Sequence, residues 1–177
     1  MVSPQEGVAR AMAIARTATR PVVIADTQDN PGCGGTADST GLLRALVDAK
    51  ADGAVLGFLC DAEAAKAAHA AGEGAAIDIA LGGRSGPEGV TPFQGRFTVT
   101  RLGSGKFRTS GAVSGGREVD LGPMALLTIG GVSVAAAIPE DKESSAMALR
   151  SRVRPSAGAA GLAATFTTGF SNAAAFG

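Results

Sequence analysis

Three aspartates and several glycines gather between Asp26 and Thr40, and this segment holds the residues best suited to chemistry. A glycine-rich turn that enters a helix leaves backbone N–H groups without intrahelical partners. Together with the helix dipole, these groups attract an anionic or carbonyl oxygen. The carboxylates suit another role, in which they orient a polar ligand or lie beside a metal site. The candidate ligand-binding residues are Asp26, Asp29, Asn30, Gly32, Gly34, Gly35, Asp38, Ser39 and Thr40. A turn that serves only the fold is the alternative interpretation.

The segment matches no named phosphate-binding motif. No Gly-Lys-Ser/Thr follows it, which excludes a Walker loop, and residues 32–34 lack a third glycine at dinucleotide spacing. The residue types therefore indicate a candidate site without a motif that names its ligand.

Metal binding and nucleophilic catalysis have few candidates. His69 is the one histidine, and it falls near the carboxyl end of an alanine-rich helix, where an imidazole interacts favourably with the helix dipole. An independent zinc site needs three or four Cys, His or carboxylate ligands, and no HExxH, HxH or CxxC motif is present. Cys33 is interpreted as a small residue in a glycine-like position, with a thiol nucleophile as the alternative, and Cys60 as a core residue. We expect neither a metal ligand nor a catalytic residue within this chain.

Composition indicates a single globular domain. The chain has 177 residues, of which 45% are hydrophobic, a normal share for a packed core. Sixteen basic and sixteen acidic residues give zero formal charge, and no basic stripe interleaves with aromatic residues, so nucleic acid is not an expected partner. Two cysteines are too few for a disulfide scaffold, which favours a reducing compartment and a cytoplasmic location.

The uncharged stretch 121–139 is close in length to a membrane span. However, Gly130 and Gly131 interrupt it, and a Gly-Gly pair reaches the positive φ values of a tight hairpin turn. A β-hairpin over 124–138 is therefore the better interpretation, and no membrane partner is expected. The first fifteen residues carry charges of both signs, so no signal peptide is expected either.

Sequence periodicity predicts a strand before the candidate segment and a helix after it. Residues 22–25 form a short apolar run rich in β-branched residues, typical of a strand buried on both faces. Apolar residues over 42–47 recur at helical spacing, with 38–40 available to cap the amino end. An earlier helix is predicted over 5–18, begun by a Ser-Pro pair. The candidate segment therefore lies at a strand-to-helix junction.

A second unit repeats this order, with a strand over 54–59, a helix over 61–71 and a third strand over 75–81. Strands that alternate with helices imply right-handed crossovers and a parallel sheet. Beyond this unit, glycine turns separate shorter strands, which indicates antiparallel pairing, and a helix is predicted over 141–152. These shorter strands are predicted over 95–102, 106–113 and 124–138. The predicted fold class is α/β: a three-layer-like βαβαβ parallel core, then a smaller antiparallel β portion and a C-terminal helix.

Residues 21–43 read PVVIADTQDNPGCGGTADSTGLL, and this stretch resembles the signature that opens the carboxy-terminal domain of the microcystinase C family of zinc metallopeptidases. The resemblance continues at residues 61–64 (DAEA), 81–84 (LGGR) and 120–123 (DLGP). It covers a domain over 3–154, and 155–177 is a diverged tail without charge, expected to be loosely ordered.

The resemblance implies hydrolysis of peptide or amide bonds in a small peptide-like substrate. It also implies that zinc is held by a larger amino-terminal domain, rich in His, Asp and Glu, which this sequence lacks. Such a metal-binding domain is the expected partner, on the same or another polypeptide. Two departures argue against independent activity. Cys33 breaks the family's run of glycines, and the Lys, His and Arg of the family's final strand are absent from the corresponding residues 161–170.

Two hypotheses of different classes follow. In the first, the chain is the substrate-closing domain of a zinc metallopeptidase, inactive without the metal-binding half. In the alternative, it is a non-catalytic truncated remnant or small polar ligand-binding module, with self-association as a homo-oligomer. An exposed apolar helix face at Val8, Met12 and Ala15 would favour the alternative, because an absent domain would have covered that face.

Overall fold

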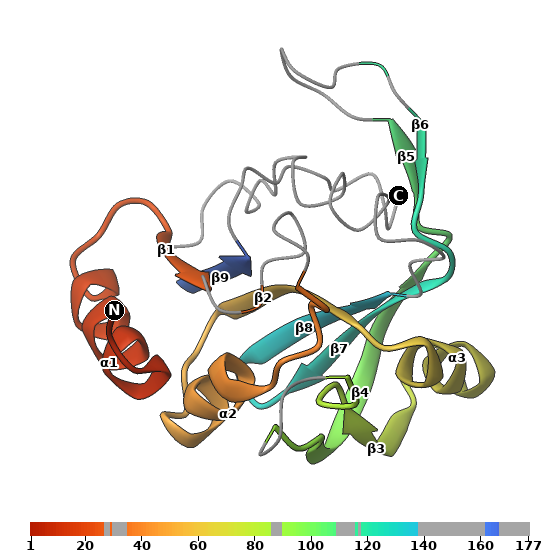
Figure 1. Cartoon of the computed structure of the whole chain (residues 1–177), viewed down its shortest axis with the longest axis horizontal. Helices are drawn as coiled ribbons and strands as arrows, with labels where there is room; N and C mark the ends of the chain where they lie inside the picture. The colour runs from red at the N-terminus through yellow and green to blue at the C-terminus, as the bar shows by residue number, and fades with distance from the viewer. Residues whose placement is uncertain are drawn as a thin grey trace.

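Helices and one large sheet make up the fold in a computed structural model of the chain (Figure 1). The structure describes residues 1–26, 29, 35–85, 90–108, 116 and 118–137, and the backbone of 162–166. Three helices lie within these residues: α1 (Pro4–Ala15), α2 (Gly41–Asp48) and α3 (Ala62–Ala71).

Short-range signals in the sequence explain where the helices begin. Ser3 caps α1, because its hydroxyl accepts the backbone N–H of Glu6 at 3.2 Å and Pro4 occupies the first turn. The helix predicted over 5–18 is confirmed, although it ends at Ala15. Asp61 caps α3 in the same way, and Gly72 ends that helix with a positive φ.

Seven strands form the main sheet, in the order β1-β9-β2-β8-β7-β4-β3. Their bounds are β1 (Val22–Asp26), β9 (Leu162–Phe166), β2 (Ala54–Cys60), β8 (Val132–Ala137), β7 (Met124–Ile129), β4 (Phe93–Gly103) and β3 (Ala76–Leu81). The first four strands in this order pair in parallel, and the others pair antiparallel. The predicted α/β class, with parallel and antiparallel parts, is confirmed.

The position of the third strand in chain order differs from the predicted parallel core. β3 pairs antiparallel with β4 at the sheet edge, and β7 and β8 lie between β4 and β2. The antiparallel strands therefore extend the same sheet rather than forming a separate portion. A strand-helix-strand order implies a parallel crossover only when the two strands are neighbours in the sheet. Sequence periodicity does not show which strands are neighbours.

The prediction that β1 is buried on both faces is wrong. One face of the strand is exposed, with Val23 at 61%, whereas Val22 and Ile24 on the other face are partly buried. β1 is the other edge strand of the sheet and pairs with β9, in the part of the chain that we expected to be a loosely ordered tail from its composition. A strand here agrees with the family resemblance, which expects a final strand within 161–170. The predicted helix over 141–152 and the rest of the tail lie outside the described residues.

The β7–β8 hairpin confirms the interpretation of the uncharged stretch. Its turn is Gly130-Gly131, and Gly130 has a φ of 57°. A Cβ on Gly131 would lie 2.6 Å from the Ala51 carbonyl oxygen, so glycine also permits close contact there. Within the described residues, no helix is long and apolar enough to cross a membrane.

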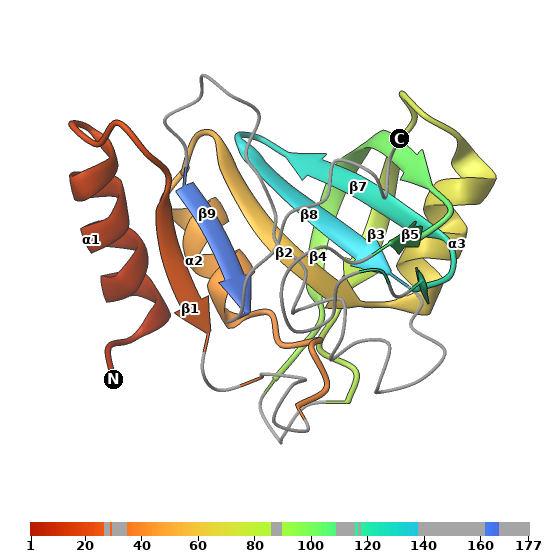
Figure 2. The ribbon, with the colours of Figure 1, turned by 90° about the horizontal axis from the view of Figure 1, so that it is seen from above.

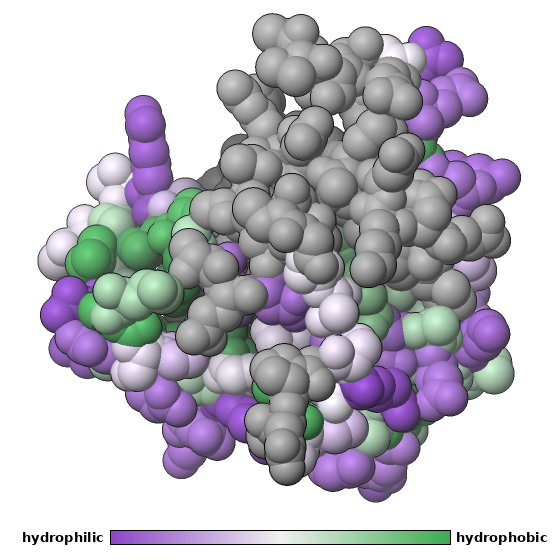
Figure 3. Space-filling model, in the orientation of Figure 1, coloured by the Kyte–Doolittle hydropathy of each residue, from purple (hydrophilic) through white to green (hydrophobic). Residues whose placement is uncertain are grey.

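Helices α2 and α3 cover one face of the sheet, and α1 lies beside β1 at its edge (Figures 1 and 2). Leu43 and Leu46 of α2 are fully buried in the core with Phe97 and Leu127 of the sheet. The apolar face of α1 is covered as well, because Val8 is fully buried and the helix packs against α2 and β1. Exposed hydrophobic surface is seen instead over another part of α1 and over β1 (Figure 3).

Candidate functional site

The candidate segment lies where three parallel strands end. Asp26 is the last residue of β1, and the Ala37 carbonyl accepts the backbone N–H of Cys60, at the end of β2, at 2.8 Å. The next residue, Asp61, donates its N–H to the carbonyl of Ala137, at the end of β8, at 3.0 Å. Parallel strands end at the same edge of a sheet, and open α/β sheets bind ligands outside that edge. The segment is therefore in the position where this class of fold holds its ligands.

Asp29 is 8% exposed, and its carboxylate accepts three consecutive backbone N–H groups. Oδ1 accepts from Ala37 at 2.9 Å, and Oδ2 accepts from Asp38 and Ser39, each at 2.8 Å. The Thr36 hydroxyl adds a longer hydrogen bond of 3.3 Å to Oδ1. We call this arrangement, Asp29 with residues 36–39, the Asp29 clasp. It holds the backbone of residues 37–39 against the Asp29 carboxylate.

Ala37 is the residue whose backbone most needs the clasp. Its φ is 55°, a left-handed conformation that costs a residue with a Cβ about 1–2 kcal/mol. The residue is fully buried, and both of its backbone polar groups are bonded, the N–H to Asp29 and the carbonyl to Cys60. The surrounding hydrogen bonds therefore maintain a conformation that alanine does not favour on its own.

Asp38 is 2% exposed and also accepts four hydrogen bonds at its carboxylate. Oδ1 accepts the Thr36 hydroxyl at 2.7 Å. Oδ2 accepts the backbone N–H of Arg84 at 2.8 Å and both the N–H and the hydroxyl of Ser85 at 2.7 Å. Burial raises the pKa of the Asp38 carboxyl, but the bonds from Thr36, Ser85 and Arg84 outweigh burial and hold it below its usual value. Asp38 is therefore an ionised carboxylate enclosed by donors.

Two glycines allow the chain after β3 to approach the candidate segment closely. A Cβ on Gly82 would lie 2.6 Å from the Asp38 carbonyl oxygen, and a Cβ on Gly83 would lie 2.5 Å from the Thr91 carbonyl carbon. Both glycines have a φ of 64°. Gly83 also donates its N–H to the Asp38 carbonyl at 2.6 Å. Glycine is therefore needed twice here, for the backbone conformation and for the space.

Asp61 joins the same region from the end of β2. Its Oδ1 accepts the N–H of Ala64 at 2.9 Å, which caps α3, and its Oδ2 accepts the N–H of Gly82 at 2.8 Å. The Arg84 guanidinium lies 3.5 Å from Asp61 Oδ2 and 3.1 Å from Glu63 Oε2. One carboxylate thus holds both the start of α3 and the chain after β3.

Thr40 occupies the N-cap position of α2, but its side chain makes no capping hydrogen bond. The hydroxyl instead donates to the Thr91 carbonyl at 2.8 Å. Arg44, one turn further along α2, donates to the carbonyls of Thr91 and Pro92 at 3.1 and 2.8 Å and stacks over the ring of Phe93. Helix α2 is therefore fastened to the chain that leads into β4.

The structure brings Asp29, Asp38, Ser39 and Thr40 together as predicted, and it ends β1 at Asp26. Asn30, Gly32 and Gly34 lie outside the described residues, as does Cys33. Gly35, Ser39 and Asp26 are partly exposed, whereas the side chains of Asp29, Asp38 and Thr40 are buried and bonded to the protein itself. The prediction that these residues bind a ligand is not tested by their position.

Sequence reasoning missed the residues on the facing chain, Arg84, Ser85 and Thr91. The segment from Gly82 to Ser85 was interpreted as a loop from its composition, and the LGGR stretch entered only through the family resemblance. These residues contribute mainly backbone groups, and residue type carries no signal for the tertiary partner of a backbone N–H.

The donor set of the described residues does not fit a zinc site. No group of three or more His, Cys, Asp or Glu side chains in that part of the chain could hold a metal ion. His69 lies in the last turn of α3, as predicted, and its Nε2 is 3.0 Å from the Met124 carbonyl oxygen. The Asp29 and Asp38 carboxylates accept four hydrogen bonds each, as described above. Zinc would have to displace those bonds.

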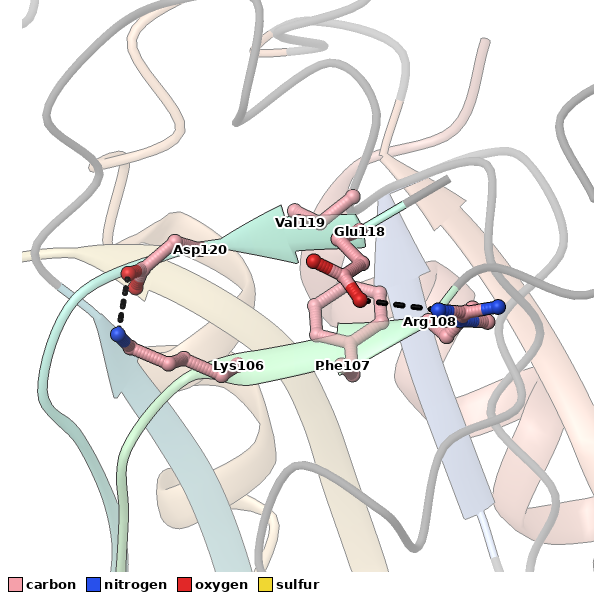
Figure 4. A pocket seen from close by; sticks show the side chains of 6 residues that line it. All are labelled: Lys106, Phe107, Arg108, Glu118, Val119 and Asp120. Carbon is pink, nitrogen blue, oxygen red and sulfur yellow. Dashed lines mark hydrogen bonds and ion pairs between the residues drawn. The ribbon is translucent and has the colours of Figure 1, made fainter. Parts of the chain in front are cut away.

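A separate pocket of about 450 Å³ lies at the small β5–β6 ribbon (Figure 4). The ribbon pairs β5 (Lys106–Arg108) with β6 (Glu118–Asp120). All six residues line the pocket, and the ion pairs Lys106–Asp120 (3.4 Å) and Arg108–Glu118 (2.9 Å) lie on either side of Phe107 and Val119. The four charged side chains are more than half exposed, so solvent screens these pairs and they contribute little to stability. None of the candidate residues lines this pocket.

Comparison with known proteins gives three similarities. The sequence profile of a family described as MlrC C-terminus matches residues 24–145. Microcystinase C from Sphingomonas sp. is 32% identical over 100 residues, which are 56% of this chain and 20% of that protein. A crystal structure from Mesorhizobium sp. BNC1, of a protein provisionally described as a metallopeptidase, has a TM-score of 0.75 at 24% identity. That match covers 97% of this chain and 37% of the other, and it supports the fold. The chain thus spans well under half the length of either relative.

Proposed function

Because this chain belongs to the MlrC C-terminus family, we propose that it is the substrate-closing domain of a zinc metallopeptidase. The reaction is the hydrolysis of a peptide or amide bond in a small peptide-like substrate. The zinc is bound by a separate metal-binding domain, on the same or another polypeptide. The substrate-closing domain is inactive without that metal-binding domain. The name of the Sphingomonas relative supports the proposal, as does the provisional description of the Mesorhizobium protein.

The observation that carries the proposal is the Asp29 clasp at the carboxyl edge of the parallel strands. The clasp fixes residues 36–39 by three bonds of 2.8–2.9 Å to one buried carboxylate. A binding loop needs a fixed base, because a preorganised loop loses less conformational entropy when a ligand binds. The clasp therefore supports a loop that presents its groups to a substrate rather than a turn that only connects two elements.

Three residues of this edge are partly exposed: Asp26, Gly35 and Ser39. In the proposal, the Asp26 carboxylate accepts an amide N–H of a peptide, and the Ser39 hydroxyl and the Gly35 N–H orient a carbonyl oxygen. Donors held in place beside a carbonyl also stabilise the oxyanion that develops during hydrolysis. No catalytic step is assigned to a metal held by this chain, because the described donor set does not fit zinc.

A chimera tests the proposal. This chain replaces the matching segment of the Mesorhizobium protein, and zinc content is measured by mass spectrometry after purification without chelator. Fragment release from a pool of linear and cyclic peptides is measured in parallel. The chimera is expected to bind zinc and cleave peptides, whereas this chain alone and the relative without the segment are inactive. Near-stoichiometric zinc with turnover in the isolated chain would contradict the proposal. So would a folded, zinc-loaded chimera without turnover beside an active parent.

Single substitutions in the chimera separate the site from the scaffold. Ser39→Ala and Asp26→Asn are expected to lower kcat/KM about tenfold, the value of one hydrogen bond to a polar substrate. Asp52→Asn is the matched control, because Asp52 is exposed and its carboxylate accepts the N–H of the adjacent Gly53, away from the candidate site. An effect of equal size in the control would argue against a substrate-binding role for Ser39 and Asp26.

An exposed apolar face on α1 would favour the alternative, a non-catalytic remnant, and the structure does not favour it on this criterion. Of the three residues in that criterion, Val8 is buried, and Met12 and Ala15 are partly buried against the core of the domain itself. We further propose that the protein is cytoplasmic and binds neither nucleic acid nor membrane. Its zero formal charge and two cysteines support this assignment.

A further inference from the structure

We propose that Asp38 joins the β1 loop to the β3 loop, so that the two loops open and close as one unit. The β1 loop is defined here as residues 35–40 and the β3 loop as residues 82–85. The inference goes beyond the proposed function, since it concerns the motion of the loops and holds whether or not the domain takes part in catalysis.

Asp38 receives hydrogen bonds from three consecutive residues of the β3 loop. Gly83 donates its N–H to the Asp38 carbonyl at 2.6 Å. Arg84 and Ser85 donate their N–H groups to Asp38 Oδ2 at 2.8 and 2.7 Å, and the Ser85 hydroxyl donates to the same oxygen at 2.7 Å. Asp38 and Gly83 are buried, so separating the two loops would leave Asp38 Oδ2 and the Gly83 N–H without partners, whereas the exposed Arg84 and Ser85 can bond to water instead.

Each loop is also anchored on the side away from Asp38. The β1 loop is held by the bonds of Ala37, Asp38 and Ser39 to Asp29. The β3 loop is held by the bond of Gly82 to Asp61. Asp38 thus connects two loops that are each anchored at another point, and we call this connection the joint. Thr40 makes a further bond, but to Thr91, which lies beyond the β3 loop as defined.

The charge of Asp38 strengthens this joint. Within the described part of the chain no cationic side chain pairs with it, because the Arg84 guanidinium lies against Asp61 and Glu63 instead. The Asp29 carboxylate shares the Thr36 hydroxyl with Asp38. The negative charge of Asp38 is therefore balanced by N–H and O–H donors alone. Hydrogen bonds to a charged acceptor are about twice as strong as neutral ones.

A joint of this kind has a consequence for ligand binding. A ligand that orders the β1 loop also orders the β3 loop, although it touches only one of them. The shared opening equilibrium carries the effect between them.

Amide hydrogen exchange of the full chain tests the proposal. Ser85→Ala removes one hydrogen bond from the β3 loop and leaves the charge of Asp38 and every backbone donor in place, so the chain is expected to fold. Ser3→Ala is the matched control, because it also removes one serine hydroxyl bond, to Glu6, at the start of α1. We expect the backbone amides at positions 84 and 85 to exchange about tenfold faster in Ser85→Ala. We expect the same factor for the amides of Ala37, Asp38 and Ser39, and no change at either loop in Ser3→Ala.

Two results would overturn the proposal. Faster exchange confined to the β3 loop would mean that the loops open independently. Equal acceleration throughout the core would mean that the substitution weakens the whole fold and that no specific joint exists. Asp38→Asn provides the reciprocal measurement, with faster exchange expected at Arg84 and Ser85. If that variant does not fold, the Ser85→Ala result decides alone.

Discussion

The carboxylate of Asp29 accepts the backbone N–H of Asp38 at 2.8 Å, so one buried aspartate fixes the backbone of the other. The two carboxylates also share the Thr36 hydroxyl. Neither needs a cation, because backbone N–H groups surround both. The pair that the sequence offers as ligand-binding carboxylates therefore forms the internal support of the loop.

Replacement of Asp29 by alanine is expected to lower the free energy of unfolding by about 3 kcal/mol, because it leaves the N–H groups of Ala37, Asp38 and Ser39 without their acceptor. Urea denaturation monitored by circular dichroism measures the change. Asp78→Ala is the control, since Asp78 is exposed and forms a 3.5 Å ion pair with the exposed Arg96, and it is expected to lower the free energy of unfolding by less than about 1 kcal/mol. Equal costs for the two variants would show that the clasp does not stabilise the fold.

The lowered pKa of Asp38 predicts a contribution to stability that depends on pH. A carboxyl whose pKa is lower in the folded state stabilises the protein above its unfolded pKa, about 3.9. That contribution is lost as the pH falls through the folded pKa. The difference in unfolding free energy between the wild type and Asp38→Asn is therefore expected to be constant near neutral pH and to shrink below about pH 4. Denaturation curves collected from pH 7 to pH 2 measure it, and a difference that stays constant to pH 2 would contradict the lowered pKa.

The parts of this fold that depend on neighbouring residues were predictable. The Ser3-Pro4 start of α1 and the Gly130-Gly131 hairpin turn follow from chemistry that acts within three or four residues, and the structure confirms both. The pairing of β3 with β4 was not predictable, because the apolar pattern of a strand shows that it is buried but not which strand lies beside it.

The candidate site shows the same limit. Its location at the junction of β1 and α2 follows from the glycines and aspartates of the segment. The bond from Asp61 to Gly82 joins residues 21 positions apart, and the bonds from Asp38 to the β3 loop join residues 46 and 47 positions apart. Backbone donors provide most of these contacts, and every residue except proline has one. Asp38 could therefore be recognised as a candidate residue from the sequence, but not as the residue that connects two loops.

Gly82→Ala is expected to lower the stability of the fold by more than the positive φ of Gly82 alone explains. The left-handed conformation costs about 1–2 kcal/mol, and the new Cβ would also lie 2.6 Å from the Asp38 carbonyl oxygen, so the loops must separate. Gly130→Ala is a matched control, because Gly130 has a φ of 57° with nothing within 4 Å of the Cβ position. Thermal unfolding of both variants isolates the steric part. Equal losses of stability in the two variants would mean that the backbone near Gly82 and Asp38 can move apart without lowering stability further.

Substitutions of Asp61 separate its two hydrogen bonds, one to Ala64 and one to Gly82. Serine is a good N-cap but has a single side-chain oxygen, so Asp61→Ser keeps the cap of α3 and loses the bond to Gly82. Asp61→Ala loses both. The alanine variant is expected to be less stable than the serine variant by about 1 kcal/mol, the value of a cap. The serine variant is expected to be less stable than the wild type by about 1–3 kcal/mol, because the Gly82 N–H is left without its acceptor and the Arg84 ion pair is lost. Guanidinium denaturation measures both steps. If the serine variant were as stable as the wild type, Asp61 would serve only as a helix cap, and the β3 loop would depend on Asp38 alone for its attachment.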